Sequence, residues 1–173
     1  MPAQSVKPKV HSQLDAYLDG LRMLAARELS EAQVRQRLAR RGHSGDDIDR
    51  AVARLREARA IDDDRVAEAI ARRETAVRRR GRLRARQQIE RAGIDAATAR
   101  RALDEVFSTV DADDLLEAAL GKGLRGRTRI GTDAEFRRLY RYLVGQGFEP
   151  QRVLDRLKQN RKAHDAHSEE PEE

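Results

Sequence analysis

Apolar residues recur at helical spacing along most of the chain. The first stripe consists of Leu14, Tyr17, Leu18, Leu21, Leu24 and Ala25, and residues three or four positions apart share one face of a helix. Two more stripes consist of Val34 and Leu38, then of Ile48, Val52 and Leu55. Ser30 is a typical N-cap, Gly42 a typical end of a helix, and Asp46 begins the next one. The pattern therefore predicts three short helices before residue 58.

The same arrangement returns in the middle of the chain. The acids Asp62, Asp63 and Asp64 precede a long helix that contains Val66, Ile70 and Val77 and is interrupted at Gly81. A helix with Leu83 and Ile89 then ends at Gly93, and residues 95–107 form a third, with Ala99, Leu103 and Val106 on one face. This is a second set of three predicted helices.

A third set begins at Asp111. Its first helix holds Leu115, Leu116 and Leu120, and a glycine-rich joint follows over residues 121–131. Thr132 caps a second helix, with Phe136, Leu139, Tyr140 and Leu143, which ends at Gly147; the last helix carries Val153, Leu154 and Leu157. In each set an apolar residue stands four positions before the helix-ending glycine: Leu38 before Gly42, Ile89 before Gly93, Leu143 before Gly147.

The helix-ending glycines recur after 51 and then 54 residues, a period typical of repeat proteins. We therefore predict an all-α protein of tandem three-helix repeats; the alternative is an ordinary helical bundle whose turns happen to end in glycine. The predicted boundaries are a disordered segment 1–12, repeats at 13–58, 59–109 and 110–161, and a disordered acidic tail 162–173.

The composition agrees with helices and restricts the chemistry. Aromatic residues make up 3% of the chain and charged residues 38%, and it has no cysteine, so disulfides and thiolate metal sites are excluded. No secretory pattern and no long apolar segment is found, which predicts a cytoplasmic protein without a membrane span. The net charge of +6 suits an anionic partner.

Positive charge is concentrated in one segment. Between Arg72 and Arg101 there are eleven arginines against Glu74, Glu90 and Asp95, which gives 11 − 3 = +8. Arginine binds phosphates and carboxylates in a bidentate manner. The candidate partner-binding residues are Arg72, Arg73, Arg78, Arg79, Arg80, Arg82, Arg84 and Arg86. If the interruption at Gly81 is mild, Arg78, Arg82 and Arg86 share one helix face. The alternative is a solvated face in a generally arginine-rich chain.

Other motifs do not predict catalysis. The run Gly121-Lys122-Gly123-Leu124-Arg125-Gly126 has dinucleotide-loop spacing but follows a helix and no strand, which favours a joint between helices. The acids 62–64 lack the alternation of a calcium loop and are better read as a helix start. The histidines lie in tails and a polar turn, with no partner at catalytic spacing. We expect no enzyme activity, no metal and no cofactor.

Several of these stretches together resemble the RecX family of regulators of the RecA recombinase. They are the segment from Ser30 to Gly42, the segment Ile61-Asp62-Asp63-Asp64-Arg65-Val66-Ala67, the block from Gly81 to Ile94, and Arg141-Tyr142-Leu143 with Gly147-Phe148. The resemblance covers residues 14–160. It implies three three-helix units in an elongated, curved array, and a role in DNA repair and homologous recombination.

The resemblance also implies a partner. It predicts that the protein binds the RecA filament on single-stranded DNA and inhibits its ATP hydrolysis, its extension and strand exchange. We assign the arginine segment to this contact as a hypothesis, with weak direct DNA binding as a further expectation and a monomer as the expected state. Two alternatives stay open: a direct DNA-binding protein that uses residues 30–55 as a helix-turn-helix, and a generic helical adaptor. Asp46, Asp47 and Asp49 oppose the first, because they begin the helix that would enter the DNA groove.

Overall fold

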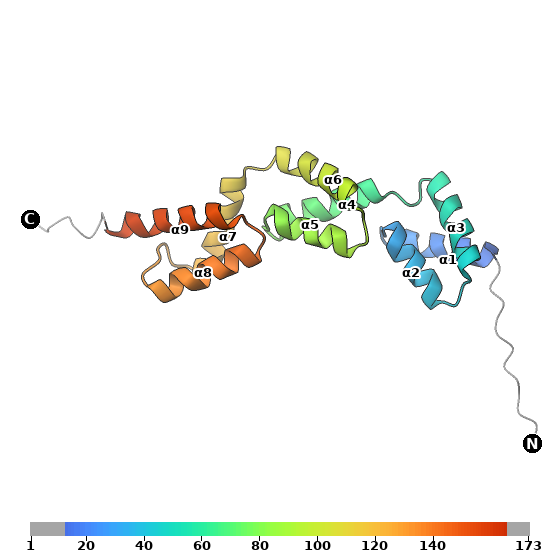
Figure 1. The fold of residues 1–173 in the computed structure, drawn as a ribbon, viewed down its shortest axis with the longest axis horizontal. Coiled ribbons are helices and arrows are strands. Elements are labelled where there is room, and N and C mark those ends of the chain that lie inside the picture. The colour runs from blue at the N-terminus through green and yellow to red at the C-terminus, as the bar shows by residue number, and fades with distance from the viewer. Residues whose placement is uncertain (1–12, 166–173) are drawn as a thin grey trace, which may run out of the picture. The chain divides into compact units, whose positions relative to one another are not determined.

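The computed structural model describes residues 13–165, and these residues form helices and no strand. In chain order (Figure 1) the elements are α1 (Gln13–Ala26), α2 (Glu31–Arg40), α3 (Gly45–Glu57), α4 (Asp63–Arg72), the π-helical segment η1 (Arg73–Val77), α5 (Arg82–Arg91), α6 (Ala96–Ser108), α7 (Ala112–Leu124), α8 (Asp133–Gly145) and α9 (Pro150–Asp165). The all-α prediction is confirmed. The predicted segment 1–12 and residues 166–173 of the predicted tail lie outside the described residues.

The chain divides into two compact units. Unit 1 extends to Val66 and includes Ala92–Ile94, and unit 2 comprises Ala67–Arg91 and the chain from Asp95 onward. The helices follow one another in the predicted order. The boundaries of the three repeats stay a prediction.

Side chains at the predicted positions begin most of the helices. The Ser30 hydroxyl accepts a hydrogen bond from the N–H of Gln33, whose side chain returns to Ser30 in a capping box. The side chains of Asp95, Asp111 and Thr132 cap α6, α7 and α8 by accepting hydrogen bonds from backbone N–H groups. The carboxylate of Asp62 accepts from the N–H of Arg65 at 2.9 Å. One prediction is corrected: α3 is capped by Ser44, two residues before Asp46.

Unit 1 is held by an apolar core and by hydrogen bonds at the start of α2. Val34, Leu38 and Leu55 are fully buried between its helices. The Ser30 hydroxyl, itself buried, donates to the carbonyl of Ala92. The N–H of Glu31 donates to the Asp63 carboxylate at 2.9 Å. The start of α2 therefore contacts two later segments of the chain.

A buried histidine connects α1 to the turn after α2. The His43 side chain is fully buried, and its Nε2 lies 3.1 Å from the Asp19 carboxylate. This hydrogen bond lowers the pKa of Asp19, with further contributions from Arg22 and Arg41 against the opposing effect of desolvation. The charged carboxylate is thus the form that unit 1 favours.

Acid should therefore weaken unit 1 through Asp19. A carboxyl whose pKa is lower in the folded chain stabilises the fold above its unfolded value of about 3.9, and this stabilisation is lost as the pH falls through the folded pKa. We expect the free energy of unfolding, measured with urea between about pH 5 and about pH 3, to fall more steeply in the wild type than in Asp19→Asn. Parallel curves would contradict this expectation.

The core of unit 2 is formed largely by α7, α8 and α9, and α8 contacts both of the others; the three helices are seen close together in Figure 1. Its fully buried side chains include Leu116, Leu120, Ile130, Leu139, Leu143 and Leu157. All but Ile130 lie on helices, and Ile130 belongs to the loop before α8. The amide of Asn160 fixes this loop, because its oxygen accepts from the N–H of Ile130 at 3.1 Å.

The turn after α8 is in backbone contact with the start of α5. The N–H of Gly81 donates to the carbonyl of Gln146 at 3.0 Å, and the N–H of Leu83 donates to that of Gly147 at 3.1 Å. A Cβ on Gly81 would lie 2.3 Å from the Gly147 oxygen, and one on Gly147 would lie 2.2 Å from the Arg84 nitrogen. The N–H groups of Gly81 and Leu83, which have no partner within α5, thus bond to carbonyls of the turn. The two backbones approach so closely that neither Gly81 nor Gly147 can carry a Cβ.

Two predictions about helix ends need correction. The predicted glycine-rich joint at 121–131 begins only after Leu124, because Gly121 and Gly123 lie inside α7. Gly123 packs closely against α8, since a Cβ on Gly123 would lie 2.9 Å from the Leu139 side chain. The helix predicted to run to Gly81 ends earlier, with Arg79 in the left-handed region at φ 54°. Val77, predicted within that helix, is 72% exposed.

Substitution at Gly147 should disrupt unit 2. Gly147→Ala combines a φ of +89° with a backbone overlap, and we expect unfolding to become easier by at least about 2 kcal/mol. Gly145→Ala is the matched control, because Gly145 is helical and a Cβ there meets no atom within 4 Å; it should be neutral or stabilising by up to about 1 kcal/mol. Urea unfolding followed by circular dichroism measures both. Equal effects would show that the contact with α5 contributes nothing.

Candidate functional site

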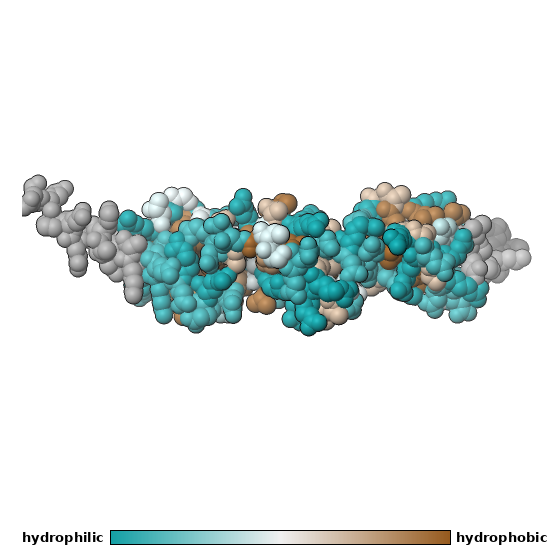
Figure 2. Space-filling model, turned by 90° about the horizontal axis from the view of Figure 1, so that it is seen from above, coloured by the Kyte–Doolittle hydropathy of each residue, from teal (hydrophilic) through white to brown (hydrophobic). Residues whose placement is uncertain are grey.

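The eight candidate arginines lie on the end of α4, on η1, and on α5 and the segment before it, all within unit 2. In the view of Figure 2 most of the visible surface is hydrophilic, with apolar residues in smaller patches. The run is not one continuous helix face. Its members divide into arginines bound to the fold and arginines directed outward.

Arg78 and Arg80 are bound to the fold by one buried acid. The Glu74 side chain is 3% exposed, and its two carboxylate oxygens accept from Arg78 and Arg80, each at 2.8 Å. Arg80 also donates to the side-chain oxygen of Gln146 at 3.3 Å. These two guanidinium groups compensate a buried charge. This role of Glu74 was not predicted from the sequence, in which its only signal is an acid within the arginine run.

Arg82 connects α5 to α6. Its guanidinium donates to the Leu103 carbonyl at 3.1 Å and to the Asp104 carboxylate, and it lies 5.6 Å from the centre of the Phe107 ring. Arg82 therefore has a structural role, although its side chain is still 41% exposed.

Arg78, Arg82 and Arg86 were predicted to share one helix face if the interruption at Gly81 was mild, and this condition is not met. The helix that carries Arg78 ends there, and the left-handed turn at Arg79 redirects the chain before α5 begins at Arg82. Only Arg82 and Arg86 keep the four-residue spacing on a single helix. The interruption is a complete helix end, because the N–H of Arg80 bonds back to the Glu74 carbonyl at 2.9 Å.

The remaining candidates are directed outward. Arg73 and Arg79 are exposed. Arg72, Arg84 and Arg86 contact neighbours on their own helix, namely Glu68 at 2.9 Å, Gln87 at 3.3 Å and Glu90 at 2.7 Å. The exposed ion pairs of Arg72 and Arg86 contribute little to stability, so these two side chains can exchange partners at small cost, whereas Arg84 is half-buried. Arg100 on α6 is also exposed and was not among the eight candidates.

Two neighbouring grooves adjoin the outward arginines. The cationic groove, about 480 Å³, is lined by Arg82, Leu83, Arg86, Ala96, Ala97, Arg100 and Leu103. The apolar groove, about 550 Å³, is lined by Gly81, Arg82, Leu83, Phe107, Ala112, Leu115, Gly147, Phe148, Glu149, Pro150 and Arg152. Arg82 and Leu83 belong to both grooves. Leu83, in the first turn of α5, is 47% exposed.

The start of α6, beside the cationic groove, is already capped. The Asp95 carboxylate accepts the N–H groups of Thr98 and Ala97, and these backbone hydrogen bonds, that of Thr98 first, lower its pKa. Bonds from the N–H groups of Asp114 and Asp113 lower the pKa of Asp111 in the same way at the start of α7. An anion in the cationic groove would therefore bind to guanidinium groups.

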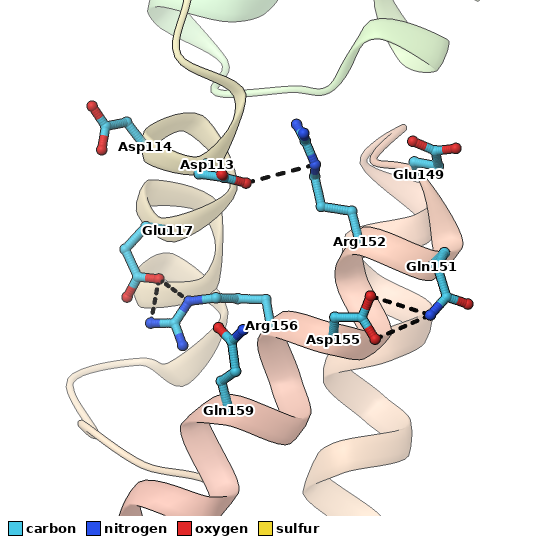
Figure 3. A pocket seen from close by; sticks show the side chains of 9 residues that line it. All are labelled: Asp113, Asp114, Glu117, Glu149, Gln151, Arg152, Asp155, Arg156 and Gln159. Atoms are coloured by element: carbon cyan, nitrogen blue, oxygen red, sulfur yellow. Dashed lines mark hydrogen bonds and ion pairs between the residues drawn. The ribbon is translucent and has the colours of Figure 1, made fainter.

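A third groove lies between α7 and α9 and is shown in Figure 3. Its charged side chains pair with one another: Arg156 with Glu117 at 2.6 Å and Arg152 with Asp113 at 3.6 Å. Gln151 donates to Asp155 at 3.0 Å. The two ion pairs of this groove thus join α7 to α9, and the bond between Gln151 and Asp155 lies within α9.

Within residues 13–165, no three or more histidine, aspartate or glutamate side chains gather as a metal site would require. In the same part of the chain no helix is both long and apolar enough to cross a membrane.

The chain is thus a small all-α protein that carries arginine-lined grooves. Residues 16–55 match the family model described as RecX, first three-helix domain. The chain is similar to the regulatory protein RecX of Syntrophotalea carbinolica, with 30% identity over 140 residues, 78% of this chain and 88% of that protein. It is 26% identical to the regulatory protein RecX of Chlorobaculum tepidum over 138 residues, 80% of this chain and 83% of that one.

Solved structures have the same fold. A crystal structure of regulatory protein RecX matches with a TM-score of 0.73 and 21% identity over 85% of this chain and 71% of that chain. RecX from Lactobacillus salivarius matches with a TM-score of 0.69 and 18% identity over 85% of this chain and 97% of that chain. The chain belongs to the RecX family.

Removing the Glu74 carboxylate should destabilise unit 2. Glu74→Gln leaves the exposed Arg78 and the half-buried Arg80 without their counter-charge, and we expect a loss of about 1.5–3 kcal/mol, the contribution of a charge-assisted hydrogen bond. Glu90→Gln is the matched control, because Glu90 pairs with Arg86 on the exposed face of α5; it should cost less than about 0.5 kcal/mol. Thermal and urea unfolding compare the two variants. A Glu74→Gln protein as stable as Glu90→Gln would contradict the structural role of Arg78 and Arg80.

Proposed function

We propose that the protein binds the RecA filament on single-stranded DNA in the cytoplasm and lowers its ATP hydrolysis, its extension and its strand exchange. It acts by binding and not by catalysis. The observation that carries this proposal is the cationic groove of unit 2, where Arg82, Arg86 and Arg100 gather without a lining acid, in a chain of the RecX family.

The outward arginines are suited to a polyanionic assembly. Guanidinium groups form charge-assisted hydrogen bonds with carboxylates and phosphates, each contributing about 1.5–3 kcal/mol. A filament of protein on DNA offers both kinds of anion. Arg72, Arg73, Arg79, Arg84 and Arg86 are the members of the predicted set that we assign to this contact, together with Arg100. Arg78 and Arg80 support them through the fold, and Arg82 both joins α5 to α6 and lines the cationic groove.

The alternative of a direct DNA-binding protein finds less support in α3. Ser44 and Asp47, at its start, bond to each other at 2.7 Å, and Asp46 is exposed beside them. Asp49, one turn further, pairs with Arg35. Carboxylates at the start of a recognition helix would repel phosphates.

The test is the ATPase rate of the recombinase on single-stranded DNA while this protein is titrated in. We expect inhibition well below one molecule per recombinase monomer. Arg86→Glu combined with Arg100→Glu should weaken inhibition about tenfold or more, since two charge-assisted contacts are reversed. Arg137→Glu, at an exposed position on α8, is the matched control and should inhibit as the wild type does.

Each result has a distinct meaning. Inhibition that survives the double reversal would keep the function and discard this surface. No inhibition at any ratio, with tight and strongly salt-dependent binding to bare DNA, would replace the proposal with the DNA-binding alternative.

A further inference from the structure

We propose that the apolar groove beside Leu83, hereafter the Leu83 groove, binds a segment of a partner protein in which apolar side chains are flanked by carboxylates. This inference rests on the proposed function and deepens it, because it specifies which chemistry of the filament the surface recognises. The carboxylates would bind in the cationic groove, which shares Arg82 and Leu83 with the apolar one.

The lining of the Leu83 groove favours an apolar side chain. Phe148 and Leu115 form buried parts of it, and Phe107 and the exposed Leu83 form others. Its charged members, Arg82, Arg152 and Glu149, include both signs. A groove of about 550 Å³ accommodates one or two large side chains, and burying them is the main source of affinity in protein interfaces.

The groove is formed before any partner arrives. The N–H of Leu83 bonds to the Gly147 carbonyl at 3.1 Å and that of Gly81 to the Gln146 carbonyl at 3.0 Å. Arg82 is bound to α6 through the Leu103 carbonyl and the Asp104 carboxylate. Leu83 is thus exposed on a backbone fixed on both sides. Preorganised surfaces lose little conformational entropy on binding.

The combination of an apolar and a cationic groove distinguishes protein from nucleic acid. Arg82, Arg86 and Arg100 alone would suit phosphates as well as carboxylates. The apolar lining offers nothing to a sugar–phosphate backbone, and the aromatic Phe107 is half-buried beneath the Arg82 guanidinium, so it gives no free platform for bases. The pair of grooves therefore favours an acidic and apolar segment of a protein.

The experiment compares Leu83→Gln with Val77→Gln by fluorescence anisotropy. Val77 is the matched control, because it is 72% exposed on η1 and lies outside both grooves. Three ligands are titrated with the full chain: the recombinase filament on single-stranded DNA, the same DNA alone, and a labelled peptide of alternating Leu–Leu and Glu–Glu pairs. Peptides with Lys in place of Glu, or Ser in place of Leu, are the controls for charge and for apolar contact. Circular dichroism checks that both variants fold.

We expect Leu83→Gln to bind the filament at least about tenfold more weakly, the loss of one leucine from an interface. Its affinity for the DNA alone should be unchanged, and Val77→Gln should equal the wild type throughout. If Leu83→Gln binds the filament as the wild type does, the Leu83 groove is not the docking site. If it loses affinity for DNA alone to the same extent, the groove contacts nucleic acid and the inference fails.

If the wild type does not bind the filament at all, the proposed function is wrong. The titration with the peptide then tests the Leu83 groove independently. Peptide binding that requires Glu, Leu and Leu83 would support the groove. Binding of no peptide, or equal binding of the Ser-containing control, would overturn it.

Discussion

The arrangement of unit 2 depends on one backbone contact, between the turn at Gln146 and Gly147 and the start of α5. The free N–H groups at a helix start need acceptors, and Gly81 has no side chain to provide one. Carbonyls of the turn provide them instead, which requires the two backbones to approach so closely that neither glycine can carry a Cβ. The start of α2 in unit 1 meets the same need with the Ser30 hydroxyl, which also donates to the Ala92 carbonyl. N–H groups at the start of α5 therefore bond to backbone carbonyls, whereas an N–H group at the start of α2 bonds to a side chain.

This contact also determines how the arginine segment is presented. With α5 fixed, Arg82 reaches α6, Leu83 is exposed, and Arg86 lies one turn further along the cationic groove. Before α5, the buried carboxylate of Glu74 binds Arg78 and Arg80. The arginines of this segment thus differ in role. Arg78 and Arg80 pair with Glu74, Arg82 joins α5 to α6, and the others face outward. The proposed recognition of the filament depends on the outward arginines and on the Leu83 groove beside them.

Much of the fold could be predicted because its signals are local. Ser30, Asp95, Asp111 and Thr132 cap helices through bonds to residues two or three positions away, and Gly42, Gly93 and Gly147 end helices with positive φ. The errors arose where distant residues compete with local preference. Gly123 lies inside α7 and packs closely against Leu139, and Val77, although apolar, lies outside the core. Arg79 takes a left-handed conformation usually left to glycine, where a helix had been predicted to continue.

The sequence by itself determined that the chain is helical, where most helices begin and end, and that positive charge gathers between residues 72 and 101. These properties follow from spacing, capping and composition, which involve neighbours in the chain. Only the tertiary structure decided which arginines serve the fold and which face outward, because Glu74, Gln146, Leu103 and Asp104 act on them across 4 to 66 residues. It also decided that Leu83 is exposed beside an apolar groove, since the turn at Gly147 and the side chains of α6 and α7 form that groove from segments far apart in the chain.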